Sequence, residues 1–332
     1  MITLKQHEIT PAVPASFSWD AQTLPTKPAW RMKVEEKTID RFRHDTEDFL
    51  LDDDSFNKYA HGDVKNIGIQ ELADHISQEL QHGSGVVWLQ SFPTEGFTVA
   101  QKKFFYLAVG AAMGQTMGNY GRLYDVQDYG ESYKTERIPV SQTRAASGFH
   151  TDSSARNCMP DTVALLCIQP AHYGGESLVV SGATVHEQLQ KTNMEALTIL
   201  YREFIRDIVT PGAGKTLEAL INNRFPIFSQ GLYSPGLSFR YMRYWIEKGH
   251  EEAKVDLAKE DINALDTLDD LLESPQLAVR FKLEAGDQLW VNNHIVAHNR
   301  TEYEPDSQQP RHLVRMWISS HKRQPPSTRS TD

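Results

Sequence analysis

The chain has 332 residues, 39% of them hydrophobic and 23% charged, which is ordinary for a globular protein of one large or two small domains. The formal net charge of −10 argues against nucleic acid as the main partner, because phosphate binding needs a basic stripe. No apolar run approaches the roughly 18 residues of a membrane span, and the first residues lack the basic start and apolar core of a secretory signal.

The N-terminal third begins with a polar segment and continues with helical patterns. Residues 1–65 are punctuated by prolines and have weak periodicity, so we expect an N-terminal extension packed on the core. Apolar residues at helical spacing over Ile69–Leu80 predict a helix that ends at Gly83, and the apolar run Val86–Leu89 predicts a strand. A second helix is predicted over Val99–Met113.

From about residue 120 the sequence changes to short β-prone segments separated by turn residues. One inserted helix is predicted to start near Thr184 and to carry Leu197, and another runs over Lys259–Leu272 with Ile262 on its apolar side. Many short strands with inserted helices predict a mainly β fold with flanking helices, a decorated β-sandwich or jelly roll. The predicted strands are Val163–Ile168, Glu176–Val180, Phe204–Val209, Pro226–Phe228, Leu237–Tyr241, Val279–Leu283, Gln288–Val291 and His312–Ile318.

The two cysteines, Cys158 and Cys167, are too few to form a disulfide framework in a chain of this length. Cys167 lies in an apolar run and is interpreted as a small core residue. A chain with so few cysteines fits a reducing compartment, so we expect a cytoplasmic protein.

The sharpest local motif is His150-Thr151-Asp152. In an extended segment, residues two apart point to the same face, so this imidazole and carboxylate can converge on one ion. A mixed nitrogen and oxygen set suits Fe(II), where two histidines and one carboxylate leave the opposite face for a chelating co-substrate and O2. By itself the triplet is weak, because His-x-Asp often arises by chance, and a surface histidine beside a turn aspartate would then be the better interpretation.

Two histidines near the C-terminal end, His294 and His298, could supply the second imidazole. Their spacing of four would place both on one face of a helix, as in a zinc site of a hydrolase. The β-branched residues around them and the preceding Gly286-Asp287 turn instead favour a strand and loop, where one histidine suffices. The spacing to the next motif favours His298.

That motif contains Arg311, thirteen residues after His298, and Arg315, four residues further on. In a strand the two arginines share a face. A guanidinium binds a carboxylate through two parallel hydrogen bonds, which suits the distal end of a dicarboxylic keto acid. Taken alone, two surface ion pairs on an acidic protein would be the better interpretation.

Together these motifs resemble the taurine dioxygenase and clavaminate synthase-like superfamily of iron(II)/2-oxoglutarate-dependent oxygenases, over roughly residues 65–320. Each motif is modest, but all of them occur in the order typical of the family. The segments that carry the resemblance are Gly85–Pro93, Phe149–Asp152, Gly174–Ser177, and Ala297–Thr301 followed by Arg311 and Arg315.

The resemblance implies a double-stranded β-helix, or jelly-roll, core over residues 66–320. It also implies a helical insert at about 184–275, and we expect residues 321–332 to form a flexible tail.

The resemblance also implies the residues of the active site and their roles. Arg311 would bind the distal carboxylate of 2-oxoglutarate with Ser177, and Arg315 would lie near the co-substrate or the acid group of the substrate. An aspartate at position 152 argues against halogenation, since chlorinating relatives have Gly or Ala there. The implied iron ligands are His150, Asp152 and His298.

The implied reaction is hydroxylation or desaturation of an unactivated C–H bond, with release of succinate and CO2. We expect a small amino-acid-like or natural-product substrate, with the segments Tyr120–Tyr129 and Gln142–Arg144 beside its pocket. Two other classes stay open: a non-catalytic jelly-roll binding protein, and a zinc-dependent hydrolase that uses His294 and His298. No sequence pattern indicates an oligomeric state.

Overall fold

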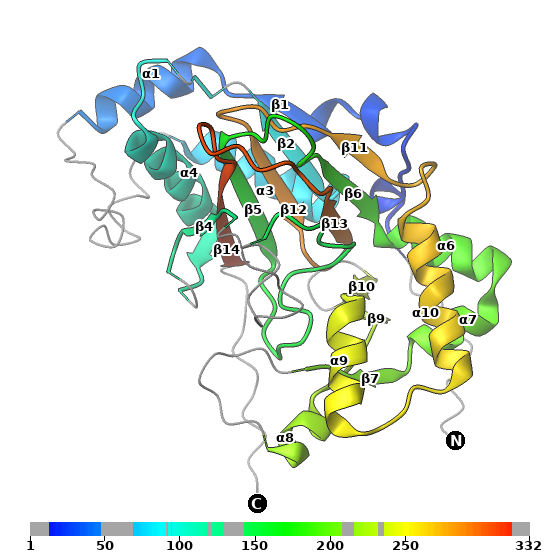
Figure 1. Ribbon diagram of the computed structural model, residues 1–332. Coiled ribbons are helices and arrows are strands. Elements are labelled where there is room, and N and C mark those ends of the chain that lie inside the picture. The colour runs from blue at the N-terminus through cyan, green and yellow to red at the C-terminus, as the bar shows by residue number, and fades with distance from the viewer. Residues whose placement is uncertain are drawn as a thin grey trace, which may run out of the picture.

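The computed structural model describes residues 13–47, 69–90, 92–93, 95–118, 121–128, 143–207, 216–231 and 236–320. Two β-sheets form the centre, and helices flank them (Figure 1). Over the described ranges, no helix has the length and apolar character needed to cross a membrane. The expected tail and residues 1–12 and 48–65 of the expected extension lie outside these ranges.

The larger sheet has seven strands, with β5 at its centre between β12 and β14. All its pairs are antiparallel except β1 with β2. From one edge to the other the strands are β1 (Arg31–Lys33), β2 (Val86–Gln90), β12 (Gln288–Asn292), β5 (Thr162–Gln169), β14 (His312–Ser320) and β3 (Gly114–Thr116), with β4 (Tyr124–Val126) also paired to β14.

The two faces of this sheet belong to two different buried clusters, as the two-residue period of a strand requires. Ala164 and Leu166 of β5 pack in one cluster with the helices α3 (Gln70–His82) and α4 (Val99–Met113). Cys167 of β5 packs in the other cluster, on the inner face. Helix α4 is almost entirely apolar from Phe104 onwards, and this part is buried between α3 and the sheet. The helices α3 and α4 therefore seal one face and leave the inner face for the site.

A second, three-stranded sheet lies on the inner side, in the antiparallel order β11 (Val279–Phe281), β6 (Ser177–Ser181) and β13 (Val296–Arg300). The helices α6 (Gly182–Thr192), α7 (Met194–Leu200) and α10 (Lys259–Leu272) pack together beside it, as Figure 1 shows. Their apolar residues join the same cluster as the inner face of the larger sheet.

The remaining elements are one helix near the N-terminus and a group of short elements between α7 and α10. Helix α1 (Glu36–Asp45) buries Ile39 and Phe42 in the cluster that contains residues of α4. The elements between α7 and α10 are β7 (Glu203–Ile205), paired with β8 (Arg224–Pro226), α8 (Leu217–Asn222), β9 (Phe228–Gln230), paired with β10 (Leu237–Phe239), and α9 (Arg243–Ala253).

The structure confirms the predicted helices over Val99–Met113 and Lys259–Leu272 and the interpretation of Cys167 as a core residue. Burial raises the pKa of its thiol to about 12, and both cysteines are free. The single helix from Thr184 through Leu197 was wrong, because Asn193 leaves helical geometry there and its side chain caps the next helix. No periodicity had indicated α1, α8 or α9.

The predicted apolar side of α10 also needs one correction. Ile262 is 39% exposed, whereas Leu265 on the same helix is fully buried. A helical residue contributes to stability mainly through the apolar surface that it removes from water. The two positions are therefore energetically different despite their similar side chains.

We expect Leu265→Ala to lower the free energy of unfolding by about 2–5 kcal/mol, because it leaves a cavity in the core. Ile262→Ala on the same helix should lower it by less than about 1 kcal/mol, since that side chain is partly solvated. Urea denaturation followed by circular dichroism measures both. Equal losses for the two variants would contradict the packing of α10.

Candidate active site

The site is built on a main-chain pairing between two histidines that are far apart in the sequence. The His150 N–H donates to the His298 carbonyl at 3.0 Å, and the His298 N–H donates to the His150 carbonyl at 3.0 Å. The two imidazole rings consequently lie side by side, with their centroids 4.4 Å apart. Because β13 pairs with β6, His298 is fixed in register opposite Val179.

Asp152 points to the same side as His150 because the residue between them points away. The Thr151 N–H donates to the Tyr241 carbonyl at 2.8 Å, and the Tyr241 N–H donates to Thr151 Oγ1 at 3.1 Å, so Tyr241 holds this side chain. The Asn293 side chain holds the backbone of Asp152, accepting from its N–H at 2.8 Å and donating to its carbonyl at 3.0 Å. This alternation is the one expected for an extended His-x-Asp segment.

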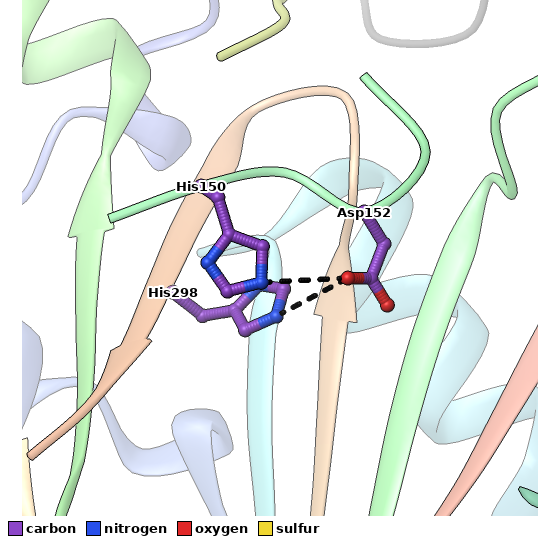
Figure 2. Close-up of side chains that lie close together, drawn as sticks. All are labelled: His150, Asp152 and His298. Atoms are coloured by element: carbon purple, nitrogen blue, oxygen red, sulfur yellow. Dashed lines mark ion pairs between the residues drawn. The ribbon is translucent and has the colours of Figure 1, made fainter. Parts of the chain in front are cut away.

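The three side chains converge with their potential ligand atoms within 4.8 Å of one another (Figure 2). Asp152 Oδ1 lies 3.5 Å from His150 Nε2 and 3.9 Å from His298 Nε2. Neighbouring ligands of an octahedral ion with bonds of about 2.1 Å lie about 3 Å apart, so a small contraction would close this group around a metal. His150 Nδ1 lies 2.9 Å from the Gly148 carbonyl, which favours a proton on Nδ1 and a free lone pair on Nε2.

The second carboxylate oxygen of Asp152 is held by the larger sheet. Trp317 Nε1 donates to Oδ2 at 2.6 Å, and Arg315 Nη1 lies 3.4 Å from the same atom. Burial alone would raise the pKa of the Asp152 carboxyl, but the charge of Arg315 and the two imidazoles outweigh it, so the pKa lies well below its usual range. Only Oδ1 is then directed at the histidines.

Burial also acts on the imidazole of His298. It lowers the pKa of His298 to about 3, and the neighbouring His150 and Arg315 act in the same direction. At neutral pH the group therefore consists of an ionised carboxylate and an unprotonated imidazole, the forms that bind a metal.

The other histidine, His294, is engaged elsewhere. Its Nε2 lies 2.9 Å from Asp161 Oδ1, and the segment around it is a turn that precedes β13, not a helix. The helical two-histidine zinc site at His294 and His298 was therefore wrong as a geometric prediction.

A buried arginine lies in the same cavity as this group. Arg311 is 6% exposed, and among the described residues it has no carboxylate partner. Its Nη1 also has no hydrogen-bond partner. Burial lowers the pKa of the Arg311 guanidinium, with Tyr303 acting in the opposite direction. A buried cation without an anion is unfavourable, so this position fits the carboxylate of a ligand.

Ser177 at the start of β6 lines the same cavity, and a close turn precedes it. Gly175 has φ of +67°, and a Cβ there would lie 3.2 Å from Arg311 Nε. The second glycine of the Gly-Gly turn thus leaves room for the guanidinium, a physical reason for that residue type.

The cavity is lined by part of the predicted segment Tyr120–Tyr129 and by residues that the sequence did not indicate. Tyr124 and Val126 of the predicted segment Tyr120–Tyr129 line it, whereas Thr143 and Arg144 do not, and Tyr120, Tyr129 and Gln142 lie outside the described ranges. Only the position of Ser153-Ser154 directly after the aspartate could have been a signal. Lining residues that no sequence pattern had indicated include Ser154, Ala155, Arg156, Met242 and Trp245.

Two imidazoles and one carboxylate beside an open cavity form the ligand set of a non-haem iron(II) oxygenase. The donor types fit that metal, and the unpaired Arg311 in the same cavity fits a dicarboxylic co-substrate. The fold and the site therefore define this class of protein.

Comparison with known proteins identifies the family. The model of the taurine catabolism dioxygenase TauD, TfdA family matches residues 61–317, and the chain belongs to this family. It is a 2-oxoglutarate-dependent dioxygenase, with Fe(II), 2-oxoglutarate and O2 as its cofactors.

Individual relatives are similar over much of the chain. FR-33289 synthase of Streptomyces rubellomurinus is 29% identical over 271 residues, which cover 79% of this chain and 77% of that protein. Uridine-5'-phosphate dioxygenase of a Streptomyces species is 27% identical over 191 residues, which cover 56% of this chain and 66% of that protein. The crystal structure of asparagine oxygenase has the same fold, with a TM-score of 0.69 at 16% identity, over 88% of this chain and 93% of that one.

We expect Trp317→Phe to weaken metal binding by about 10- to 100-fold, because it removes the hydrogen bond to Asp152 Oδ2 and keeps most of the ring volume. Competitive titration with Fe(II) or Co(II) under anaerobic conditions measures the loss. Trp290→Phe is the matched control, since that indole donates to Gln288 in the same larger sheet and lies in the cluster with α4. An unchanged metal affinity in Trp317→Phe would show that the indole does not position the carboxylate.

Proposed function

We propose that this enzyme oxidises an unactivated C–H bond of a small amino-acid-like or natural-product substrate, by hydroxylation or desaturation, with release of succinate and CO2. The observation that carries the proposal is one cavity that contains both the three-residue ligand group and a buried, unpaired Arg311. A metal and a chelating dianion would satisfy both features at once.

In this proposal His150, Asp152 and His298 hold the iron, which with 2-oxoglutarate and O2 supplies the oxidising power. The chain's own contribution is positional. Trp317 and Arg315 hold one oxygen of Asp152 and direct the other towards the histidines. The Asn293 side chain fixes the backbone of Asp152 by hydrogen bonds to its N–H and its carbonyl.

Arg311 and Ser177 would bind the distal carboxylate of 2-oxoglutarate. Both are buried and line the cavity, and Gly175 leaves space beside the guanidinium. Two parallel hydrogen bonds from the guanidinium to this carboxylate would be strong and directional in a site of low dielectric constant. They would orient the keto acid towards the metal.

Arg315 would lie near the co-substrate or the acid group of the substrate. It lines the cavity on the inner face of β14, with its guanidinium 4.9 Å from the centroid of the Tyr124 ring and 4.5 Å from that of Trp317. This packing between two aromatic rings restricts its conformations and supports a positioning role.

The names of relatives support the substrate class. One relative is a uridine-5'-phosphate dioxygenase, and one structural neighbour is an asparagine oxygenase, so small polar metabolites are substrates in proteins of similar sequence or fold. Membership in a family of dioxygenases disfavours the non-catalytic binding protein. The pairing of His294 with Asp161 disfavours the zinc-dependent hydrolase.

For the fold we propose that the two sheets form a double-stranded β-helix within one domain over residues 66–320. The segment at about 184–275 would be an insert. The pairing of β6 with β11 supports this division, because it brings together the strands on either side of the segment. The antiparallel pairs of both sheets are also consistent with a jelly roll.

The co-substrate proposal predicts that Arg311→Gln weakens 2-oxoglutarate binding by roughly 10- to 150-fold, the equivalent of about 1.5–3 kcal/mol for hydrogen bonds to a charged group. An anaerobic titration of the Fe(II) protein with 2-oxoglutarate, followed by its visible charge-transfer band, measures the affinity. Arg280→Gln is the matched control, because this exposed arginine pairs with Glu176 near the same turn. If no band and no succinate appear with the wild type, the oxygenase proposal fails.

The ligand assignment predicts different outcomes for the two neighbouring histidines. His298→Ala should abolish the charge-transfer band, because it removes a metal ligand. His294→Gln should retain it, since an amide can still hydrogen-bond to Asp161 outside the ligand group. Loss of the band only in His294→Gln would reverse the assignment.

A further inference from the structure

The segment directly after Asp152 forms a tight turn that lines the cavity. Ser153 has φ of +57°, an unusual value for a residue other than glycine, and it turns the chain back on itself. The Arg156 N–H donates to the Ser153 carbonyl at 2.9 Å and closes the turn. Ser154 follows Asp152, the proposed iron ligand, by two residues, so their Cα atoms are no more than about 7.6 Å apart. The turn is therefore adjacent to the metal position.

Side chains outside the turn hold its main chain in place. Asn223 Nδ2 donates to the Ala155 carbonyl at 3.0 Å, and the guanidinium of Arg240 donates to the Arg156 carbonyl. Asn293 holds the residue before the turn. Rigid support of this kind is what a binding site needs to keep its contact atoms in position.

Two polar side chains of the turn line the cavity. Ser154 is 1% exposed, and its Oγ has no hydrogen-bond partner. Buried hydroxyls are almost always hydrogen-bonded, so the Ser154 hydroxyl can still form a hydrogen bond to a molecule in the cavity. The half-buried Arg156 also lines the cavity.

The charge of the cavity favours an anion as that ligand. Among the described lining residues, the ionised groups are one carboxylate, Asp152, and four arginines. In the proposed function Asp152 binds the metal and Arg311 binds the co-substrate. The dianionic co-substrate and the dipositive metal offset each other, so the described lining residues keep an excess of positive charge.

The wall beside the turn is apolar. Met242 and Trp245, at the start of α9, line the cavity together with Ala155 and Tyr124. A carbon skeleton can pack against this wall while a polar group contacts the turn. The polar side chains of the turn and these apolar side chains therefore line the same cavity.

We propose that Ser154 and Arg156 form the subsite for an acidic group of the substrate, so the substrate is a small organic anion with a carboxylate, phosphonate or phosphate group. Arg156 provides the charge, and the Ser154 hydroxyl donates to an oxygen of that group. The turn thereby fixes the substrate next to the metal, and Met242 and Trp245 contact its carbon chain. This inference rests on the proposed function of the same cavity.

The test uses the anaerobic complex of the full-length protein with Fe(II) and saturating 2-oxoglutarate, so that Arg311 is already occupied. Methylphosphonate, inorganic phosphate, propionate and the neutral propionamide are each titrated while the visible charge-transfer band is recorded. The acids should shift the band saturably, and propionamide should not. Whichever acid binds more tightly distinguishes a carboxylate from a phosphorus oxyacid.

Variants of Arg156 and Ser154 test whether the acid that shifts the band binds at the turn. Arg156→Gln should weaken acid binding by about tenfold or more, Arg156→Lys by less, and Ser154→Ala by a few fold. Arg202→Gln is the matched control, since that exposed arginine pairs with Glu260 and does not line the cavity. Circular dichroism confirms that each variant folds, and the band without added acid should keep its wild-type intensity.

Two results would overturn the subsite. One is a normal band with no saturable shift on adding any acid, and the other is a shift of equal affinity in Arg156→Gln, Ser154→Ala and the wild type. Absence of the band in the wild type would instead overturn the proposed function on which the subsite rests. The two failures are therefore distinguishable in one set of titrations.

Discussion

The reciprocal main-chain hydrogen bonds between His150 and His298 are the interaction on which the site depends. They join a loop segment to β13, and β13 is in turn held in register by β6, the strand that begins at Ser177. The proposed metal position and the proposed co-substrate position are thus connected through one continuous set of backbone hydrogen bonds. A shift of one residue in this pairing would turn the His298 side chain to the opposite face of its strand.

The larger sheet contributes through the same two-residue period. Val314 and Met316 of β14 pack towards α4, while Arg315 and Trp317 face the cavity and hold Asp152. One strand therefore supplies the hydrophobic core on one face and the support of the aspartate on the other. The stability of the α4 layer and the geometry of the ligand group are set by a single register.

The cavity contains buried cationic side chains, among them Arg300 and Arg311. The guanidinium of Arg311 is buried without an anionic partner, and the hydroxyl of Ser154 is buried without any partner. Such groups reduce the stability of the protein without ligands and increase its affinity for molecules that satisfy them. The proposed co-substrate site and the proposed substrate site each contain one of these buried groups without a hydrogen-bond partner.

The sequence by itself determined the helices α4 and α10, the presence of many short strands, and the residue types of the site. Hydrophobic periods and local spacing are properties of the chain and can be read without its fold. Local spacing could not predict the main-chain hydrogen bonds between His150 and His298 or the contact of His294 with Asp161. Both join segments that are far apart in the sequence. The helix α9 and the turn at Ser154 were also decided only by tertiary structure. Packing against the rest of the fold fixes their positions.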